Sequence, residues 1–272
     1  MSARVPSELM EFRLLGGLAV VDGERVLDLS TPKQRAVLAV LLLERDRVVS
    51  VDRLIDLLWA EESDKTISSL QAYVSRLRSA LEPTRRPRDP ATILLSQPPG
   101  YRLAVAREVV DLYRFEDAVE AGLEQLREQH WERALSTLIG ALKMWSGPVL
   151  PELADESFVI AAAARANSVR LSAVEAIAHA RLEMGDHGGA AALLEHEAAG
   201  HPTRERLHGL HALALYRCGR QADALSVVDR CRRALRDSAG LDPGPDLRLL
   251  ESDLLAQSPS LEWHPPSGLS LN

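Results

Sequence analysis

The chain has 272 residues, 46% of them hydrophobic, and a net charge of −7 at pH 7, which suits about two domains with buried cores. No apolar run approaches the ~20 residues that span a bilayer, and the N-terminus lacks the charged start and apolar stretch of a secretion signal. Cys218 and Cys231 are too few for a four-ligand zinc site. We therefore expect a cytoplasmic protein with reduced thiols and with neither metal nor cofactor.

The charge is distributed unevenly along the chain. Residues 1–105 carry 15 basic and 14 acidic side chains, whereas residues 106–272 carry 17 basic and 25 acidic ones. The stretch from Lys65 to Arg102 has seven basic residues against Glu82 and Asp89 only. Such a surplus of basic residues indicates either a face that is merely solvated or a surface that binds an anionic partner such as nucleic acid.

The first hundred residues predict short strands followed by three helices. The stretch FRLLGGLAVVDGERVLDL alternates or runs apolar and is broken at GG and DG, which predicts three short antiparallel strands. A helix then begins after Thr31 as N-cap, with Pro32 at its first position. A second helix is predicted from Val51 to Trp59, capped by Ser50, and a third from about Lys65 to Leu81.

The third helix has two unlike faces. Apolar residues recur at steps of three and four and form one stripe: Ile67, Leu70, Val74, Leu77 and Leu81. The opposite face has small or basic residues: Lys65, Ser68, Ser69, Ala72, Ser75, Arg76 and Ser79. A solvated helix would usually carry Glu and Lys pairs instead. A face this small can approach DNA closely, and an arginine at its centre suits guanine recognition in a major groove, with Tyr73 and Arg78 beside the phosphates.

A proline-tipped ribbon follows this helix. Residues 92–95 and 101–105 are expected to pair as strands around a turn at residues 97–100. Two helices, a recognition helix and a β-wing make a winged helix-turn-helix. The segments VVSVDRLIDLLW, VSRLRSAL and PGYRL resemble, in order and spacing, the response-regulator (OmpR-like) type of winged-helix DNA-binding domain.

This resemblance implies roles for individual residues. Arg76 is similar to the base-contacting arginine of that family, and Tyr73, Arg78 and Trp59 are similar to its DNA-backbone contacts. Gln97 stands where the wing often has arginine, so Arg85, Arg86 and Arg88 in the preceding loop are alternative phosphate contacts. The remaining DNA-contacting candidates share the basic or hydroxyl character of this surface: Lys65, Ser68, Ser69, Ser75 and Arg102.

Residues 109–257 are rich in Ala and Leu at helical spacing and contain an internal repeat. LEMGDHGGAAALL aligns with LYRCGRQADALSV, so that Gly185 and Gly219, like Ala190 and Ala224, lie 34 residues apart. Ala134 occupies the same position 56 residues before Ala190. This period predicts stacked, tetratricopeptide-like helical hairpins.

Over residues 10 to 258, these motifs together with VDLYRFEDAV, ALKMWSGPVLPELAD and AGLDPGPDLRLLESDLL resemble the Streptomyces antibiotic regulatory protein family. The resemblance implies a winged-helix domain over residues 1–105, a bacterial transcriptional activation domain over residues 106–258 and a flexible tail over residues 259–272, as in the short class of that family.

The resemblance further implies an activator of a secondary-metabolite gene cluster, located at the nucleoid and not at a membrane. Such activators bind direct repeats in double-stranded promoter DNA, commonly as two copies side by side, and recruit RNA polymerase through its sigma factor and other subunits.

Two other functions compete with this one. An enzyme is not expected, because the string HEAAGH separates its two histidines by five residues instead of the four that place zinc ligands on one helix face. The other alternative is a helical-repeat adaptor that binds only protein, without sequence-specific DNA binding. The histidines of the repeats are interpreted as surface and interhelix residues: His187, His196, His201, His208 and His211.

Overall fold

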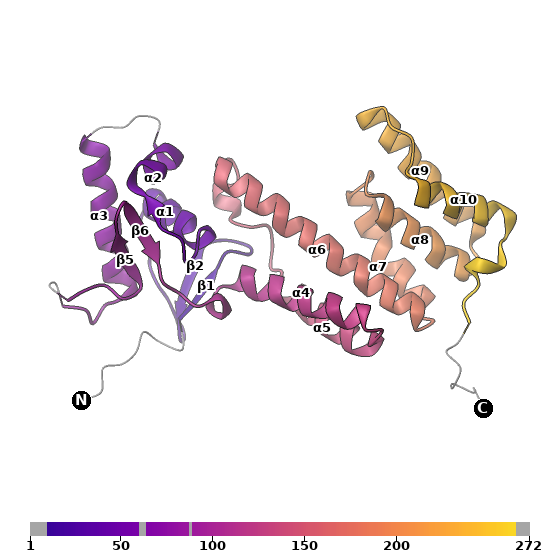
Figure 1. Ribbon diagram of the computed structural model, residues 1–272, viewed down its shortest axis with the longest axis horizontal. Helices are drawn as coiled ribbons and strands as arrows, with labels where there is room; N and C mark the ends of the chain where they lie inside the picture. Colours follow the sequence, from indigo (N-terminus) through magenta and orange to yellow (C-terminus); the bar gives the residue numbers. More distant parts are fainter. Residues whose placement is uncertain (1–9, 60–63, 87–88, 265–272) are drawn as a thin grey trace. The chain divides into compact units, whose positions relative to one another are not determined.

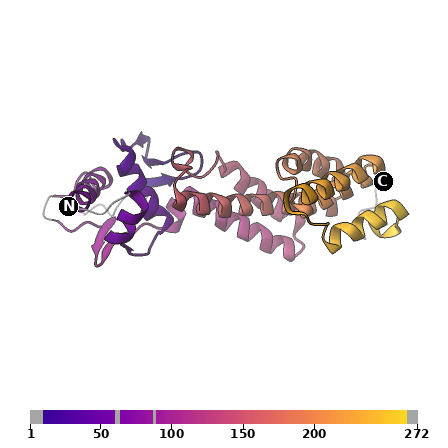
Figure 2. The same cartoon turned by 90° about the horizontal axis from the view of Figure 1, so that it is seen from above.

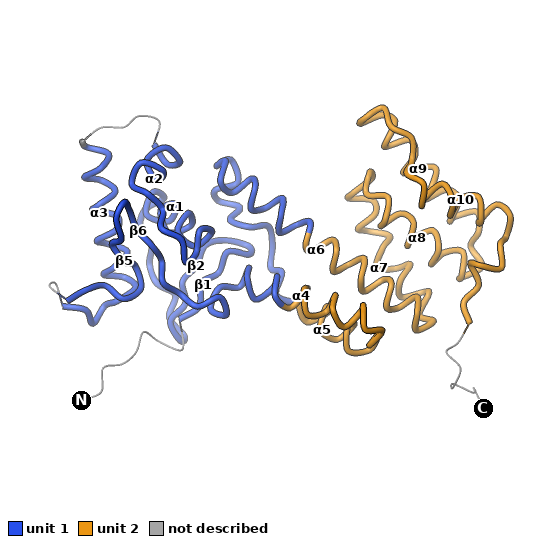
Figure 3. The backbone as a smooth tube through the Cα atoms, in the orientation of Figure 1, with its two compact units in different colours: residues 1–117, 143–168 blue, residues 118–142, 169–272 orange. Residues whose placement is uncertain are grey.

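The computed structural model describes residues 10–59, 64–86 and 89–264 of the chain. These residues form mostly α-helices with two small antiparallel sheets (Figure 1), which confirms the expected fold class. They separate into two compact units (Figure 3): unit 1 comprises residues 1–117 and 143–168, and unit 2 comprises residues 118–142 and 169–272. None of the helices in the described part of the chain has the length and apolar character needed to cross a membrane.

The first sheet of unit 1 is a meander of three short strands, as predicted. β1 (Met10–Arg13), β2 (Ala19–Asp22) and β3 (Arg25–Val26) pair antiparallel in that order. Phe12 lies opposite Val20, and both side chains are buried. The turn between β1 and β2 contains Gly16 and Gly17 at positive φ, a region that glycine enters without a Cβ penalty.

The three predicted helices of the winged domain are present: α1 (Pro32–Leu43), α2 (Val51–Leu58) and α3 (Asp64–Leu81). The side chains of Thr31 and Ser50 each accept a hydrogen bond from the backbone N–H three residues further on, at 3.2 and 3.1 Å, so both predicted N-caps are confirmed. α2 ends one residue earlier than predicted, because Trp59 has an extended backbone.

The second sheet contains the ribbon. β4 (Val49–Ser50), β5 (Leu94–Gln97) and β6 (Gly100–Leu103) are ordered β4-β6-β5 and pair antiparallel. The two ribbon strands lie nearer to the turn than predicted. Thr92 is outside β5 because Glu82 Oε1 at the end of α3 accepts hydrogen bonds from its N–H and its hydroxyl, at 2.7 and 2.5 Å.

Unit 1 also contains residues that follow the winged domain in sequence. These belong to η1 (Arg107–Val109), the start of α4 (Asp111–Arg127), the end of α5 (Trp131–Met144), η2 (Pro151–Leu153) and the start of α6 (Ser157–Glu183). The carboxylate of Asp111 accepts hydrogen bonds from the N–H groups of Leu14 and Leu15, at 2.7 and 3.2 Å. Tyr113 donates its hydroxyl to the carbonyls at the end of α1, each 3.0 Å away. These contacts cover the first sheet and the C-terminus of α1.

Unit 2 continues with α7 (His187–Gly200), α8 (Glu205–Arg217), α9 (Gln221–Ala239), α10 (Pro245–Ala256) and η3 (Pro259–Leu261). Within it, α7, α8 and α9 pack as successive neighbours (Figures 1 and 2). The repeat predicted from the sequence is confirmed. Gln129, Gly185 and Gly219 each have positive φ in an interhelical turn. The alanine five residues later is fully buried in all three cases: Ala134, Ala190 and Ala224.

The first residues of the expected tail pack within unit 2. Leu261 is buried and its carbonyl accepts a hydrogen bond from Arg217 at 2.9 Å. The indole N–H of Trp263 donates to the carbonyl of Glu183 at 3.0 Å. Residues 259–264 are therefore part of the helical unit, and the expectation for residues 265–272 lies outside the described residues.

Candidate nucleic-acid interface

The apolar stripe of α3 fixes which side of the helix is outward. Leu70, Val74, Leu77 and Leu81 are buried, and α3 packs against α1 and α2. The opposite face is accessible, since all of its residues are exposed except Ser69, which is half-buried: Lys65, Ser68, Ser69, Ala72, Ser75, Arg76 and Ser79. The structure thus places the predicted small, basic face of α3 in solvent.

The hydroxyl groups of this face are oriented by the helix itself. Ser69 donates its Oγ proton to the carbonyl of Lys65 at 2.7 Å, and Ser79 donates to the carbonyl of Ser75 at 3.1 Å. Because these protons are used within the helix, the hydroxyl oxygens present lone pairs outward. The two serines are therefore acceptors for an approaching amino or amide donor.

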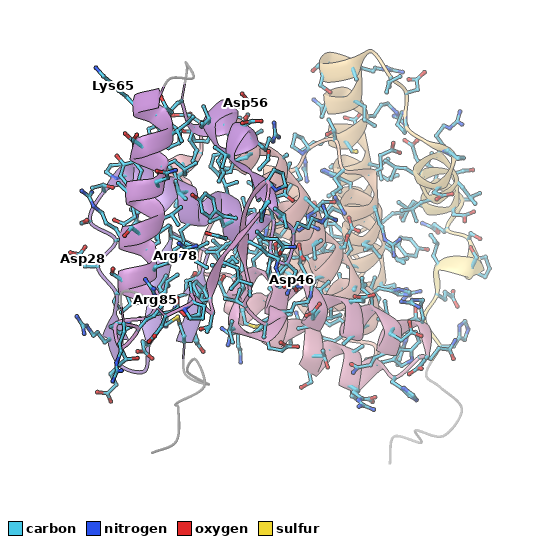
Figure 4. All side chains as sticks on the ribbon, turned by 60° about the vertical axis from the view of Figure 1, so that its left-hand side comes forward. Asp28, Asp46, Asp56, Lys65, Arg78 and Arg85 are labelled. Atoms are coloured by element: carbon cyan, nitrogen blue, oxygen red, sulfur yellow. The ribbon has the colours of Figure 1, made fainter. Side chains whose placement is uncertain are left out.

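Two cations on this face and one in the loop after α3 lack an acidic partner for their charged groups. No carboxylate lies within 4 Å of the Lys65 ammonium or of the Arg76 and Arg86 guanidinium groups among the described residues, although the backbone N–H of Arg86 donates to Asp89 at 3.3 Å. Figure 4 shows Lys65 near the N-terminal end of α3, extending away from the helix. Arg88 lies outside the described residues. Uncompensated cations at an accessible helix face attract an anion.

An aromatic and cationic row lies beside the same face. The ring of Trp59 is 6.3 Å from that of Tyr73, Lys33 Nζ lies 5.4 Å from the Trp59 ring, and the Arg76 guanidinium lies 5.9 Å from the Tyr73 ring. Lys33 Nζ also donates to the carbonyl of Leu58. Lys33 is not among the residues predicted from the sequence, because its place at the start of α1 does not reveal that this end of α1 meets the end of α2.

Arg78 has a structural role. Its Nε donates to the carbonyl of Leu94 and its Nη2 to the hydroxyl of Ser96, both at 2.8 Å, and its guanidinium lies 5.9 Å from the ring of Tyr101. Burial lowers the pKa of Arg78, with Glu82 and Tyr101 acting in the opposite direction. Arg78 therefore connects α3 to the wing through two of the five N–H donors of its guanidinium.

The wing is positioned by Gly100 and carries Gln97 at its tip. A Cβ at Gly100 would lie 1.9 Å from the carbonyl oxygen of Val49 in β4, so any other residue would push β6 away from β4. Gln97 is exposed. Arg102 on β6 faces Asp46 at 3.8 Å and is half-buried. Its charge is therefore partly compensated within unit 1.

The described residues contain no group of three His, Cys, Asp or Glu side chains that could hold a metal ion. In HEAAGH, α7 ends at Gly200, one residue before the second histidine. Glu197 instead accepts two hydrogen bonds from Arg170, at 2.7 and 2.9 Å. This glutamate is part of an interhelical ion pair in unit 2.

These features define a winged-helix protein whose second part consists of helical repeats. The family described as "Bacterial transcriptional activator domain" matches residues 110–255, and the one described as "Transcriptional regulatory protein, C terminal" matches residues 24–103. The chain therefore belongs to the bacterial transcriptional regulators that combine these two domains, the type to which the Streptomyces antibiotic regulatory proteins belong.

Individual relatives agree with this assignment. The chain is 40% identical over 260 residues to the transcriptional regulatory protein EmbR of Mycobacterium tuberculosis, covering 95% of this chain and 66% of the relative. It is 33% identical over 263 residues to the transcriptional regulator RedD of Streptomyces coelicolor, covering 94% and 75%. The solved structure of M. tuberculosis EmbR in complex with a low affinity phosphopeptide superposes with a TM-score of 0.87 at 37% identity, covering 93% of this chain and 66% of that one. The chain thus spans just under two thirds of the length of EmbR.

Proposed function

We propose that α3 lies in the major groove of promoter DNA and that the chain recognises a specific base sequence there. The supporting observation is the outward face of α3, on which small hydroxyl residues surround Arg76 and no acidic side chain is described. A small face allows the helix backbone to approach the bases, and a free guanidinium can donate two hydrogen bonds to guanine O6 and N7.

The other candidate DNA-contacting residues have different expected roles, which depend on where they lie. Lys65 and Arg86 are free cations suited to phosphate, and Trp59, Tyr73 and Lys33 form the row beside the groove wall. Ser68, Ser69 and Ser75 offer hydroxyls to base edges or phosphates, and Gln97 at the wing tip is the group nearest to an adjacent minor groove. Arg78 and Arg102 act indirectly in this proposal, by fixing the wing against α3 and the loop after α1.

Binding of this kind serves activation of transcription. Two copies of the chain bind direct repeats head to tail at the promoter of a secondary-metabolite gene cluster and recruit RNA polymerase through its sigma factor. The kinship with the transcriptional regulator RedD and with the regulatory protein AfsR of S. coelicolor supports a role in the regulation of transcription. Charge supports the part of the proposal that concerns the polymerase: residues 106–272 have eight more acidic than basic side chains, which favours a protein partner over DNA for the helical domain.

Footprinting of the full chain on promoter DNA from candidate gene clusters tests the DNA-binding proposal. We expect two protected segments of equal length, about one helical turn or slightly more apart on one face of the duplex. Arg76→Ala should lose about 1–3 kcal/mol of discrimination at one base pair. Arg86→Ala should weaken binding to all sequences equally and lower the salt slope by about one. Arg47, exposed and paired with Glu44, provides the control Arg47→Ala, which should change neither quantity.

The contrary results are equally definite. If Arg76→Ala and Arg47→Ala discriminate promoter from random DNA as well as the unchanged chain, α3 does not read the sequence. If the unchanged chain has no sequence preference at all, the protein-binding adaptor is the better description. Activation itself is measured by run-off transcription with purified polymerase on one-repeat and two-repeat templates, and occupancy without increased transcript would exclude the activator role.

A further inference from the structure

The hydroxyl proton of Ser79 on α3 is already used within the helix. Its Oγ donates to the carbonyl of Ser75 at 3.1 Å, and the residue is exposed. Because a carbonyl oxygen can only accept a hydrogen bond, the direction of this one is fixed. The hydroxyl oxygen keeps its lone pairs for an outside partner but has no proton to donate to it. Ser79 is therefore an acceptor only, which restricts the groups that it can bind.

Ser79 lies near the centre of the outward face of α3. At the helical period, its direction is within about 10° of the direction opposite to the buried stripe. Its neighbours on this face, Ala72 and Ser75, are small and exposed. The Arg76 guanidinium lies on the side of Tyr73, 5.9 Å from that ring. A short side chain at this place can therefore come within hydrogen-bonding distance of a flat surface that α3 lies against.

A side chain that only accepts hydrogen bonds distinguishes between the bases of DNA. In the major groove, adenine and cytosine present amino groups, whereas guanine and thymine present carbonyl oxygens. An acceptor that faces a carbonyl or phosphate oxygen gains no hydrogen bond, and both groups lose their water. Only the amino-bearing bases provide the donor that the Ser79 oxygen lacks.

Resting on the docking of α3 in a major groove that is proposed above, we propose that Ser79 distinguishes amino-bearing from carbonyl-bearing bases at one position of the DNA site. Every base pair contains one base of each kind, so Ser79 recognises which strand has the amino group and accepts adenine and cytosine alike. Ser79 follows Arg76 by about 4.5 Å along the helix axis. The position therefore lies within about two base pairs of the guanine proposed for Arg76.

Ser69 provides a matched control on the same helix. Its Oγ also donates to the carbonyl four residues earlier, at 2.7 Å, but the residue is half-buried and lies about 70° to one side of the outward direction. Ser69→Ala therefore removes the same kind of hydroxyl from the edge of the face. Alanine is the best helix former, so neither Ser79→Ala nor Ser69→Ala should unfold α3, which circular dichroism verifies.

Selection of binding sites from a random duplex DNA library by the full chain tests this preference. The unchanged chain should select a guanine and, within about two base pairs of it, adenine or cytosine over guanine or thymine on one strand. Ser79→Ala should keep the guanine and lower the second preference about twofold to tenfold, as expected for one neutral hydrogen bond. Ser79→Asn should narrow it to adenine, because an amide accepts from N6 and donates to N7. Ser69→Ala should leave the preference at this position unchanged.

A base analogue removes the same hydrogen bond from the DNA. At a selected site with adenine at this position, replacement by deoxynebularine removes the amino group. Binding of the unchanged chain and of Ser69→Ala should then weaken about twofold to tenfold more than binding of Ser79→Ala. An equal loss for all three proteins, or the same selected sites for Ser79→Ala and the unchanged chain, overturns the role of Ser79 alone. If the unchanged chain selects no sequence, this role and the proposed function are both overturned.

Discussion

In unit 1 the carboxylates of Asp111 and Glu152 bind backbone N–H groups of Leu14 and Leu18, which lie 97 and 134 residues away in sequence. In unit 2 the corresponding polar contacts are short in sequence, since Arg170 and Arg204 bind carboxylates only 27 and 29 residues away. The comparison teaches that each helical repeat is stabilised by the repeat next to it in the sequence. The winged domain, in contrast, is stabilised by hydrogen bonds to segments that are translated much later. A fragment that ends at residue 105 would lack those segments.

The largest effect is expected for Asp111→Ala. This carboxylate is buried and serves the N–H groups of Leu14, Leu15 and Leu112. Burial raises its pKa, against the lowering effect of these donors. Removing the acceptor leaves buried donors unpaired, and the cost should be about 3 kcal/mol of unfolding free energy in unit 1, measured by urea denaturation. Asp117, half exposed and paired with Arg107, is the control, and Asp117→Ala should cost less than about 1 kcal/mol. Equal costs would contradict the role of the long-range contacts.

The repeat packing of unit 2 is tested by Ala224→Leu. Ala224 is fully buried where α9 packs in the repeat core, so a larger side chain should overpack it at a cost of about 2 kcal/mol. Ala222→Leu on the exposed side of the same helix should be nearly neutral. Thermal denaturation followed by circular dichroism distinguishes them. If Ala224→Leu and Ala222→Leu lower the melting temperature equally, the burial of Ala224 does not constrain the packing of the repeats.

Within unit 1, the comparison of Arg78→Ala with Arg76→Ala distinguishes a side chain that holds the wing in place from one that is proposed to contact DNA. Loss of the hydrogen bonds to Leu94 and Ser96 should cost about 1–2 kcal/mol of unfolding free energy. Arg76→Ala should cost less than about 0.5 kcal/mol, because Arg76 is exposed and its described contact is the ring of Tyr73. Denaturation midpoints provide the comparison, and a stability loss in Arg76→Ala as large as in Arg78→Ala would refute this assignment of roles.

The smallest effect is a pH dependence in unit 2. The hydrogen bonds from Arg170 lower the pKa of Glu197, so the folded state holds the proton less tightly than the unfolded chain. This contribution is present above the unfolded pKa of about 4.5 and is lost as the pH falls through the lower folded value. Glu197→Gln should therefore destabilise by about 1 kcal/mol at pH 7 and by progressively less below about pH 4. Glu132 is exposed and provides the control: the stability difference between Glu132→Gln and the unchanged chain should not decrease at low pH in the same series.

Local patterns in the sequence determined much of this molecule. The N-caps Thr31 and Ser50, the buried stripe and outward face of α3, and the repeated turns at Gly185 and Gly219 follow from capping chemistry, helical period and repeat length. Each depends on residues close together in the chain, so each could be predicted without knowing what lies beside it.

Only the tertiary structure decided which side chains of these elements form hydrogen bonds or ring contacts with other parts of the chain. Arg76 and Arg78 are two residues apart and alike in sequence, yet one is free and the other is bound to the wing. Lys33 meets Trp59, and Asp111 meets Leu14, because segments distant in sequence pack together. The period of a helix fixes which side is exposed, whereas hydrogen-bond partners across an interface depend on how several segments pack at once.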